Sequence, residues 1–292
     1  MSAYTVEPRN PYFCAIASMC ANELRPRNTV TFMSEVDLLE VERLRARAFL
    51  AKRRKPSYTA LVVKAVTLAL ADFPYANRRV FRRPFGLLRI QAFDGIDATV
   101  ACERDVPGAP MATFVDVIRD VNTMDLPEIT ERLHRLATCD TRTNRQWREF
   151  SGIVTRLPSF LTALALQLPV WFPSLWAKYR GGPLLVSAPA KYGVDVVGAT
   201  WPWPLGVSFG LVRERPVVKA GALAACPTFT LTLNWDRRVM AGAQAARFFK
   251  RIVDILERAE TELAQYLALP EEKERVTSAC TEGRREEAVV SH

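Results

Sequence analysis

Histidine is the residue that this sequence contains least of, with only His134 and His292 among its 292 residues. The six cysteines are scattered and form no C-x-x-C pair, which argues against a zinc site or a disulfide framework and fits a reducing cytoplasm. The amino terminus, MSAYTVEPRN, carries charges and no apolar core segment, so we expect no signal peptide. Internal repeats are absent as well. These absences predict a cytoplasmic protein without a metal centre.

The composition itself is that of a folded soluble protein, because 49% of the residues are hydrophobic and 24% are charged. The net charge of +9 raises the question of nucleic acid, but basic residues cluster only at 52–55, 78–79 and 82–83, and no nucleic-acid motif accompanies them. We therefore expect no nucleic-acid partner. A solvated basic face and an anionic partner, such as a phosphorylated cofactor or a membrane surface, both remain open.

Hydrophobic periodicity predicts helices and strands that alternate in irregular order. Asp37, with Glu40 three residues later, has the pattern of a capping box, and Ser57 has the pattern of an N-cap. Helices are expected at 10–24, from Asp37 to about 52, and at 58–73, 126–137 and 244–268; strands are expected at 29–37, 87–92, 96–102, 184–187, 206–213 and 228–234, with one more ending at Ile118 and turns at 94–95 and 219–221. This pattern predicts an α/β (α+β) two-layer sandwich, with helices packed on a mixed sheet.

Residues 157–177 stand apart because they contain no charged residue and are rich in phenylalanine, leucine and tryptophan. Three prolines interrupt the segment, so we expect two short apolar helices that meet at the prolines in place of one membrane-spanning helix. Three roles stay open for it: packing on the domain or on a neighbouring subunit, lining a channel for a long acyl chain, or contact with a bilayer surface.

The chain divides into one domain and a tail. We place the domain at residues 1–268, with the apolar helical insert at about 157–180. The sequence from Pro270 onward is charged and aperiodic, so residues 269–292 are predicted to be a disordered charged tail.

Four segments carry a resemblance to a known family. Asn234-Trp-Asp-Arg-Arg-Val-Met-Ala-Gly242, followed by an amphipathic helix, resembles the D-H-R-x-x-x-G motif of the acyltransferase component of 2-oxo acid dehydrogenase complexes, a motif that recurs with variation in chloramphenicol acetyltransferases. Residues 30–37 resemble the family's first strand and helix cap, and residues 57–77 resemble its second helix with the terminal F-P-x-x-N. Residues 182–193, GPLLVSAPAKYG, resemble its G-T-F-T-I-S-N-L-G-x-x-G strand and turn. The resemblance covers roughly residues 8–266.

This resemblance implies a chloramphenicol acetyltransferase-like fold and a homotrimer. In the family, two substrates, one of them a coenzyme A thioester, enter a channel at each subunit interface from opposite ends. The histidine of the motif takes the proton from the incoming thiol or hydroxyl, and a serine on the facing strand donates a hydrogen bond to the tetrahedral oxyanion. The chain has no room before residue 30 for the lipoyl-bearing segment of the full complex components, so we expect no lipoyl domain.

The family's site residues carry over only in part. The oxyanion serine falls on Ser187, and Asp236 and Arg238 match the residues that flank the histidine, whose usual part is structural. The histidine position itself is Arg237. The remaining candidate substrate-binding residues, beside Arg238, are Tyr192, Trp201 and Trp203.

Arg237 changes the expected mechanism, because a guanidinium has no lone pair to accept a proton and stays charged at ordinary pH. The residue before the motif's glycine, often acidic or an amide in the family, is Ala241, and the helix expected at 10–24 has apolar residues where the family often has arginine. His134 is expected on a helix surface and His292 in the tail, so neither is a convincing replacement base.

Three hypotheses follow. The first is an enzyme with an altered site that binds an acyl thioester or another hydrophobic small molecule between subunits and uses Arg237 electrostatically, the base being the substrate, a water or an acid such as Asp195. The second is a trimeric scaffold or binding protein that has lost catalysis. The third is a membrane-surface protein that uses residues 157–177.

Overall fold

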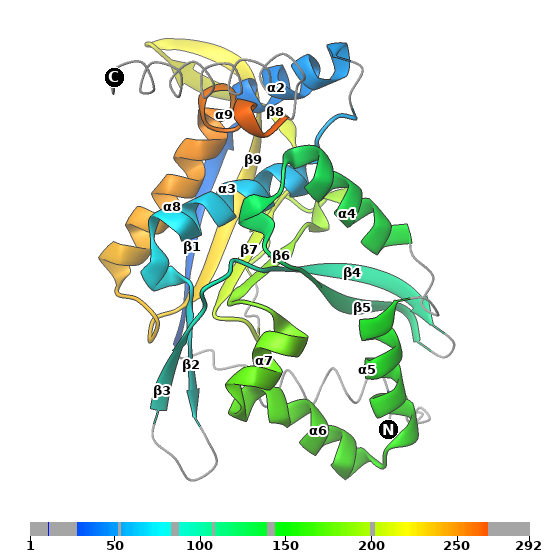
Figure 1. Ribbon diagram of the computed structural model, residues 1–292. Helices are drawn as coiled ribbons and strands as arrows, with labels where there is room; N and C mark the ends of the chain where they lie inside the picture. The colour runs from blue at the N-terminus through cyan, green and yellow to red at the C-terminus, as the bar shows by residue number, and fades with distance from the viewer. Residues whose placement is uncertain are drawn as a thin grey trace, which may run out of the picture.

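The computed structural model in Figure 1 describes residue 11 and residues 28–51, 54–82, 88–106, 109–138, 144–198 and 202–267. The helix expected at 10–24, apart from Pro11, and the tail expected from residue 269 lie outside the described residues.

The described residues form a seven-stranded mixed sheet with helices packed against it, together with a small two-stranded sheet (Figure 1). The sheet has the strand order β1-β9-β7-β6-β4-β5, and β8 extends it by pairing with the first part of β9. Its strands are β1 (Thr29–Asp37), β4 (Ala98–Val106), β5 (Ala109–Ile118), β6 (Leu184–Ser187), β7 (Leu205–Phe209), β8 (Arg213–Lys219) and β9 (Ala222–Asp236). The helices are α2 (Leu39–Leu50), α3 (Tyr58–Asp72), α4 (Leu126–Thr138), α5 (Arg145–Arg156), α6 (Ser159–Trp171), α7 (Pro173–Arg180), α8 (Gly242–Glu257) and α9 (Ala259–Glu262), with short 3-10 turns at 74–76, 121–123, 189–192 and 264–267. The predicted architecture of helices on a mixed sheet is confirmed.

Strand β6 shows how the sheet separates two apolar regions. It is the short central strand and pairs in parallel with β4 on one side and with β7 on the other. Leu184 and Val186 point into the main core, where α3 and α8 cover the sheet. Leu185 points to the opposite face and packs with Trp176 and Trp203. Because side chains alternate along a strand, Ser187 lies on the same face as Leu185, away from the main core.

Local signals located many of the elements correctly. β1 has the predicted bounds and pairs with β9 along its whole length, and Ser57 caps α3 by accepting a hydrogen bond from the backbone N–H of Ala60 at 3.1 Å. The expected capping box before α2 is wrong. Asp37 accepts from the backbone of Leu39, but Glu40 turns to the backbone N–H of Glu260, a partner that is distant in sequence.

Other differences come from pairing that the sequence does not display. The strand predicted at 87–92 is β3 (Leu88–Ala92), and it pairs with β2 (Arg78–Arg82) in a separate two-stranded sheet. Neither β2 nor α5 was expected. The strand predicted at 206–213 ends at Phe209, and the last predicted helix breaks at Arg258 between α8 and α9.

The apolar segment forms the two short helices that the prolines predict, α6 and α7, bent by 103°. The break lies at Phe172–Pro173, while Pro169 stays inside α6. Arg79 of β2 is 2% exposed, and its guanidinium donates to the carbonyls of Pro169 and Val170 at 3.4 and 3.3 Å. The last carbonyls of a helix have no partner within the helix, so this buried cation satisfies the carboxyl end of α6 and fixes its position.

Lys64 on α3 is a buried cation in the main core. It is fully buried, its Nζ donates to the carbonyls of Asn122 and Met124 at 2.9 and 2.8 Å, and it lies 3.8 Å from the ring centroid of Tyr266. Burial lowers the pKa of Lys64 from its ordinary 10.5 to about 8, and the charge of Asp125 opposes part of this shift.

This shift predicts a pH dependence of stability. Between pH of about 8 and about 10.5 the unfolded lysine keeps a proton that the folded lysine has released, so the free energy of unfolding gains a contribution that rises with pH; below about 8 the contribution is constant. We expect the free energy of unfolding of the protein, relative to that of Lys64→Met, to rise across this window. Urea unfolding of both proteins from pH 7 to about 10 measures it, and a difference that stays flat would contradict the lowered pKa of Lys64.

Candidate active site

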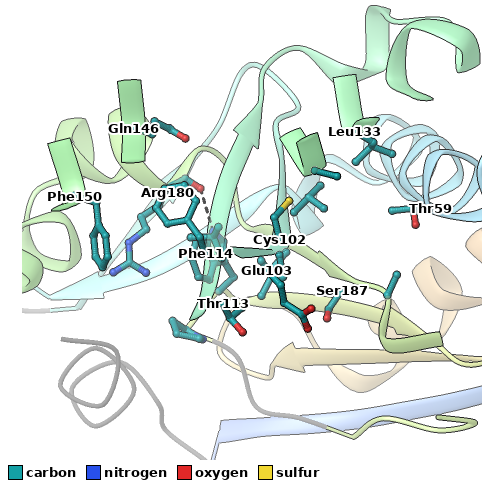
Figure 2. A pocket seen from close by; sticks show the side chains of 18 of the residues that line it. Thr59, Cys102, Glu103, Thr113, Phe114, Leu133, Gln146, Phe150, Arg180 and Ser187 are labelled. Atoms are coloured by element: carbon teal, nitrogen blue, oxygen red, sulfur yellow. Dashed lines mark hydrogen bonds between the residues drawn. The ribbon is translucent and has the colours of Figure 1, made fainter. Parts of the chain in front are cut away.

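A cavity of about 1110 Å³ lies on the face of the sheet that β6 turns away from the main core (Figure 2). It is open to solvent on one side, it is lined by residues at the start of α3, of α4, α5, α6 and α7 and of strands β4, β5 and β6, and most of its lining is apolar. The apolar lining includes Phe114, Leu133, Phe150, Ile153, Ala165, Leu166, Leu168, Pro169, Leu175, Leu185 and Trp203. Polar residues line it as well, and one group of them forms a polar end where β6 ends.

Ser187 lies at this polar end. It is the last residue of β6 and lines the cavity. Val186 pairs with Val100 on β4, so Glu103 lies one pleat further along the neighbouring strand and on the same face as Ser187; Figure 2 shows the two side chains beside each other. The Glu103 carboxylate accepts hydrogen bonds from Lys191 Nζ at 2.9 Å and from the Tyr192 hydroxyl.

The other end of the cavity contains tryptophan and arginine. Trp203 and Trp176 are buried, with ring centroids 6.1 Å apart, and the indole N–H of Trp203 donates to the carbonyl of Arg180 at 3.0 Å. Arg180 is 5% exposed and its guanidinium carbon lies 4.9 Å from the ring centroid of Trp203. In Figure 2, Arg180 extends toward Phe150.

Arg237 lies in the turn between β9 and α8, and its backbone N–H donates to Asn28. Its neighbours bind each other: Arg238 Nε donates to Asp236 Oδ1 at 2.9 Å, and this hydrogen bond raises the pKa of Arg238 above its ordinary value. This hydrogen-bonded pair is consistent with the structural role that the family resemblance implies for Asp236 and Arg238. The Arg237 side chain is exposed, and no ion pair involves it among the described residues.

Ser187 and Arg237 are far apart within one chain. Ser187 pairs with Ser208 on β7, and Ser208 pairs with Thr232 on β9. Asp236 lies four residues further along β9, a distance of about 13 Å at the rise of a strand. Ser187 and Arg237 therefore lie at opposite ends of the sheet, and Arg237 does not line the cavity.

The structure also places the other candidates. Tyr192 and Trp203 line the cavity with Ser187, whereas Trp201 and His292 lie outside the described residues. His134 has the exposed position on α4 that was expected, yet it also lines the cavity rim. Asp195 lies within 3.1 Å of Arg213 and 3.5 Å of Arg215 and is not a lining residue.

Sequence reasoning missed Glu103 and Arg180. An acidic residue inside an alternating strand resembles a solvent-facing position, and the partners of Glu103 come 88 and 89 residues later. In the described part of the chain, no three His, Cys, Asp or Glu side chains are grouped as a metal site would require. No single described helix has the length and hydropathy to span a membrane; α6 and α7 meet that test only as a bent pair.

Comparison with protein families matches residues 3–155 and 178–264 to the catalytic domain of 2-oxoacid dehydrogenase acyltransferases. A lipoamide acyltransferase component of a branched-chain alpha-keto acid dehydrogenase complex from Pseudomonas aeruginosa is 25% identical over 234 residues, covering 79% of this chain and 46% of the relative. A dihydrolipoyllysine-residue acetyltransferase component of the Bacillus subtilis pyruvate dehydrogenase complex is 23% identical, covering 83% and 48%. The chain thus spans about half the length of these curated relatives.

Solved structures confirm the fold. The dihydrolipoamide acetyltransferase of Azotobacter vinelandii superimposes with a TM-score of 0.65 at 20% identity, covering 89% of this chain and 94% of that chain. The cubic core of a pyruvate dehydrogenase multienzyme complex gives 0.64 at 21% identity, with coverage of 89% and 94%. In the Azotobacter protein a serine, a histidine and an asparagine were investigated in the catalytic mechanism, the asparagine standing four residues after the histidine. Arg237 and Ala241 have the same spacing here.

Proposed function

Because the chain belongs to the family of the 2-oxoacid dehydrogenase acyltransferase catalytic domain, we propose that it is a cytoplasmic homotrimer that binds an acyl thioester, such as an acyl-CoA, between its subunits. In this proposal Ser187 of one subunit and Arg237 of the next face the same thioester. Arg237 acts as a fixed cation and not as a base.

The separation of Ser187 and Arg237 within one chain carries the proposal. Both are accessible: Ser187 lines a cavity and Arg237 is exposed. A strand length of about 13 Å keeps them apart, so a site that uses both requires a second copy of the chain. The pairing of Asp236 with Arg238 leaves the charge of Arg237 available to such a neighbour.

Ser187 and Arg237 have different chemical roles in this proposal. The Ser187 hydroxyl donates a hydrogen bond to the thioester oxygen, which gains negative charge when a nucleophile attacks. The Arg237 guanidinium binds an anionic oxygen of the acyl group, of its carrier or of the developing oxyanion. No proton acceptor stands at position 237, so the incoming thiol must lose its proton to solvent. Loss of a general base typically costs about 10²–10⁴-fold in rate, and we therefore expect slow transfer.

One observation favours the second candidate, a trimeric scaffold without catalysis. Ala241 has no polar group, whereas an asparagine follows the histidine at the same four-residue spacing in the Azotobacter relative. Asp195, the acid considered as a substitute base, lies between two arginines. A site that lacks both the base and its neighbouring amide binds a ligand more readily than it transforms one.

Turnover measurements separate the two candidates. The purified protein is mixed with acetyl-CoA or longer acyl-CoAs and with thiol, amine and hydroxyl acceptors, and release of the CoA thiol is followed. We expect slow release that Ser187→Ala lowers by about 10²-fold or to the buffer rate, while Ser174→Ala, an exposed serine of α7 outside the cavity, leaves it unchanged. Light scattering should give the mass of a trimer for all three proteins. A trimer with no turnover above the buffer rate would support the scaffold, and a monomer would contradict both candidates.

A further inference from the structure

The cavity is larger than a two-carbon acyl group requires. Its volume of about 1110 Å³ lies just above the usual range for small-molecule sites, about 300–1,000 Å³, and most of its lining surface is apolar, as is usual for such sites. Ser187 on β6 and Phe114 on β5 both line it, with β4 between them. Two strand spacings separate these side chains, so the cavity extends over about 10 Å of the sheet before it reaches α5.

The apolar wall is built by a segment that the family does not share. Residues 156–177 fall in the gap between the two parts of the chain that match the family. From this segment, Ala165, Leu166, Leu168 and Pro169 of α6 and Leu175 of α7 line the cavity. The chain has thus added an apolar wall to the side of the sheet on which Ser187 lies.

The wall is anchored in the fold. Arg79 binds the carboxyl end of α6, and the Gln91 amide donates to the carbonyl of Pro173 at 3.1 Å, just after the bend. Gln91 also accepts from Arg79 Nε at 2.7 Å, so β2 and β3 hold the bend together. A preformed cavity loses less free energy on binding than one that must first be ordered by its ligand.

The cavity combines a polar group of side chains where β6 ends with an apolar wall on α6. Ser187, Glu103, Lys191 and Tyr192 gather where β6 ends. The lining contributed by α6 is entirely apolar, whereas α5 contributes both apolar side chains and the polar Gln146 and Glu149. A ligand that matches these two features carries a polar group that reaches Ser187 and an extended hydrocarbon chain that lies along α6. We propose that this cavity binds the hydrocarbon chain of a fatty acyl group, with the carboxyl end directed to Ser187. The proposal rests on the acyl thioester function for its context and deepens it by naming the acyl class.

Calorimetric titration with free fatty acids, from butanoate to palmitate below their micelle concentrations, tests the cavity without requiring turnover. Burial of each added methylene should tighten binding by up to about fourfold until the cavity is filled, after which the affinity should level off. Ala165→Trp places a large side chain in the cavity and should abolish binding of the longer acids. Leu164→Trp, on the 48% exposed outer side of the same helix, is the matched control and should bind as the unmodified protein does.

The thermal midpoints of both variants show whether each is folded. Equal loss of palmitate binding in folded Leu164→Trp and folded Ala165→Trp would place the lipid on the outer face of α6 and overturn the proposal. Affinity that does not depend on chain length would overturn it too. The proposed function can fail separately. If fatty acids bind with the expected chain-length dependence but no CoA is released, the cavity assignment is supported and the acyltransferase function is contradicted. If CoA is released from acetyl-CoA but no fatty acid binds, the acyltransferase function is supported and the cavity assignment is contradicted.

Discussion

Replacing Gly210 by alanine should destabilise the protein by about 3 kcal/mol or more. Gly210 follows β7, and a Cβ atom at this position would lie 1.8 Å from the carbonyl oxygen of Asp195 and 2.4 Å from its carbonyl carbon. Both are backbone atoms, so no side-chain rotation relieves the contact. The loop at 193–198 would have to leave the sheet, which breaks the hydrogen bond from Leu211 N–H to Val194 and the bond from Ser208 Oγ to Val197.

Urea unfolding at constant pH measures this change in the free energy of unfolding. Gly152→Ala is the matched control, since Gly152 lies inside α5 and an added Cβ would meet no atom within 4 Å. That substitution should stabilise the protein by about 0.5–1 kcal/mol, because alanine favours the helix over the unfolded chain. Equal stabilities for Gly210→Ala and the unmodified protein would mean that the loop does not pack against Gly210 as described.

The loop also connects stability to the candidate site. It directly follows the 3-10 turn at 189–192, which contributes Lys191 and Tyr192 to the cluster on Glu103. A displaced loop should loosen this cluster and weaken binding at the polar end of the cavity. Binding and stability are therefore expected to fall together in Gly210→Ala.

The elements that could be predicted from the sequence are those whose signals are local. Ser57 caps α3 through a residue only three positions away, and β1 alternates along its whole length. Helix α5 has a similar local signal, because Asn144 accepts from the backbone N–H of Trp147, and Trp147 and Phe150 follow at helical spacing. The sequence therefore contains the information that locates α5.

Nonlocal partners account for the rest. Arg79 belongs to a run of arginines that resembles a solvated surface, yet its backbone acceptors on α6 are 90 and 91 residues away and it is buried. Glu103 likewise belongs to the candidate site only through its contact with Lys191. That contact depends on the parallel pairing of β4 with β6, whose register no short-range signal specifies. The motif at 234–242 identified the turn that holds Arg237, but the cavity exists only because α6 and α7 fold back over β6.

Converting Arg237 to histidine should raise the rate of acyl transfer to a thiol by about 10²-fold or more, if the proposed trimer brings position 237 to Ser187 of the next subunit. Imidazole has a lone pair and an ordinary pKa of about 6.5, so it can accept the proton of the incoming thiol near neutral pH. The rate should rise with pH as the imidazole loses its proton, with a midpoint near 6.5. Release of the CoA thiol from pH 5 to about 8 measures both the gain and its pH profile.

Arg237→Gln is the control, since it removes the charge of the guanidinium without supplying a base. It should show neither the gain nor the rise through pH of about 6.5. An amide at position 241 should add to the effect, because Ala241 follows Arg237 by four residues, the same spacing that separates the asparagine from the histidine in the Azotobacter relative. The double variant Arg237→His with Ala241→Asn should therefore exceed Arg237→His alone. Identical rates and pH profiles for the histidine and glutamine variants would show that position 237 does not reach the thioester, and that the site between subunits has been lost together with its base.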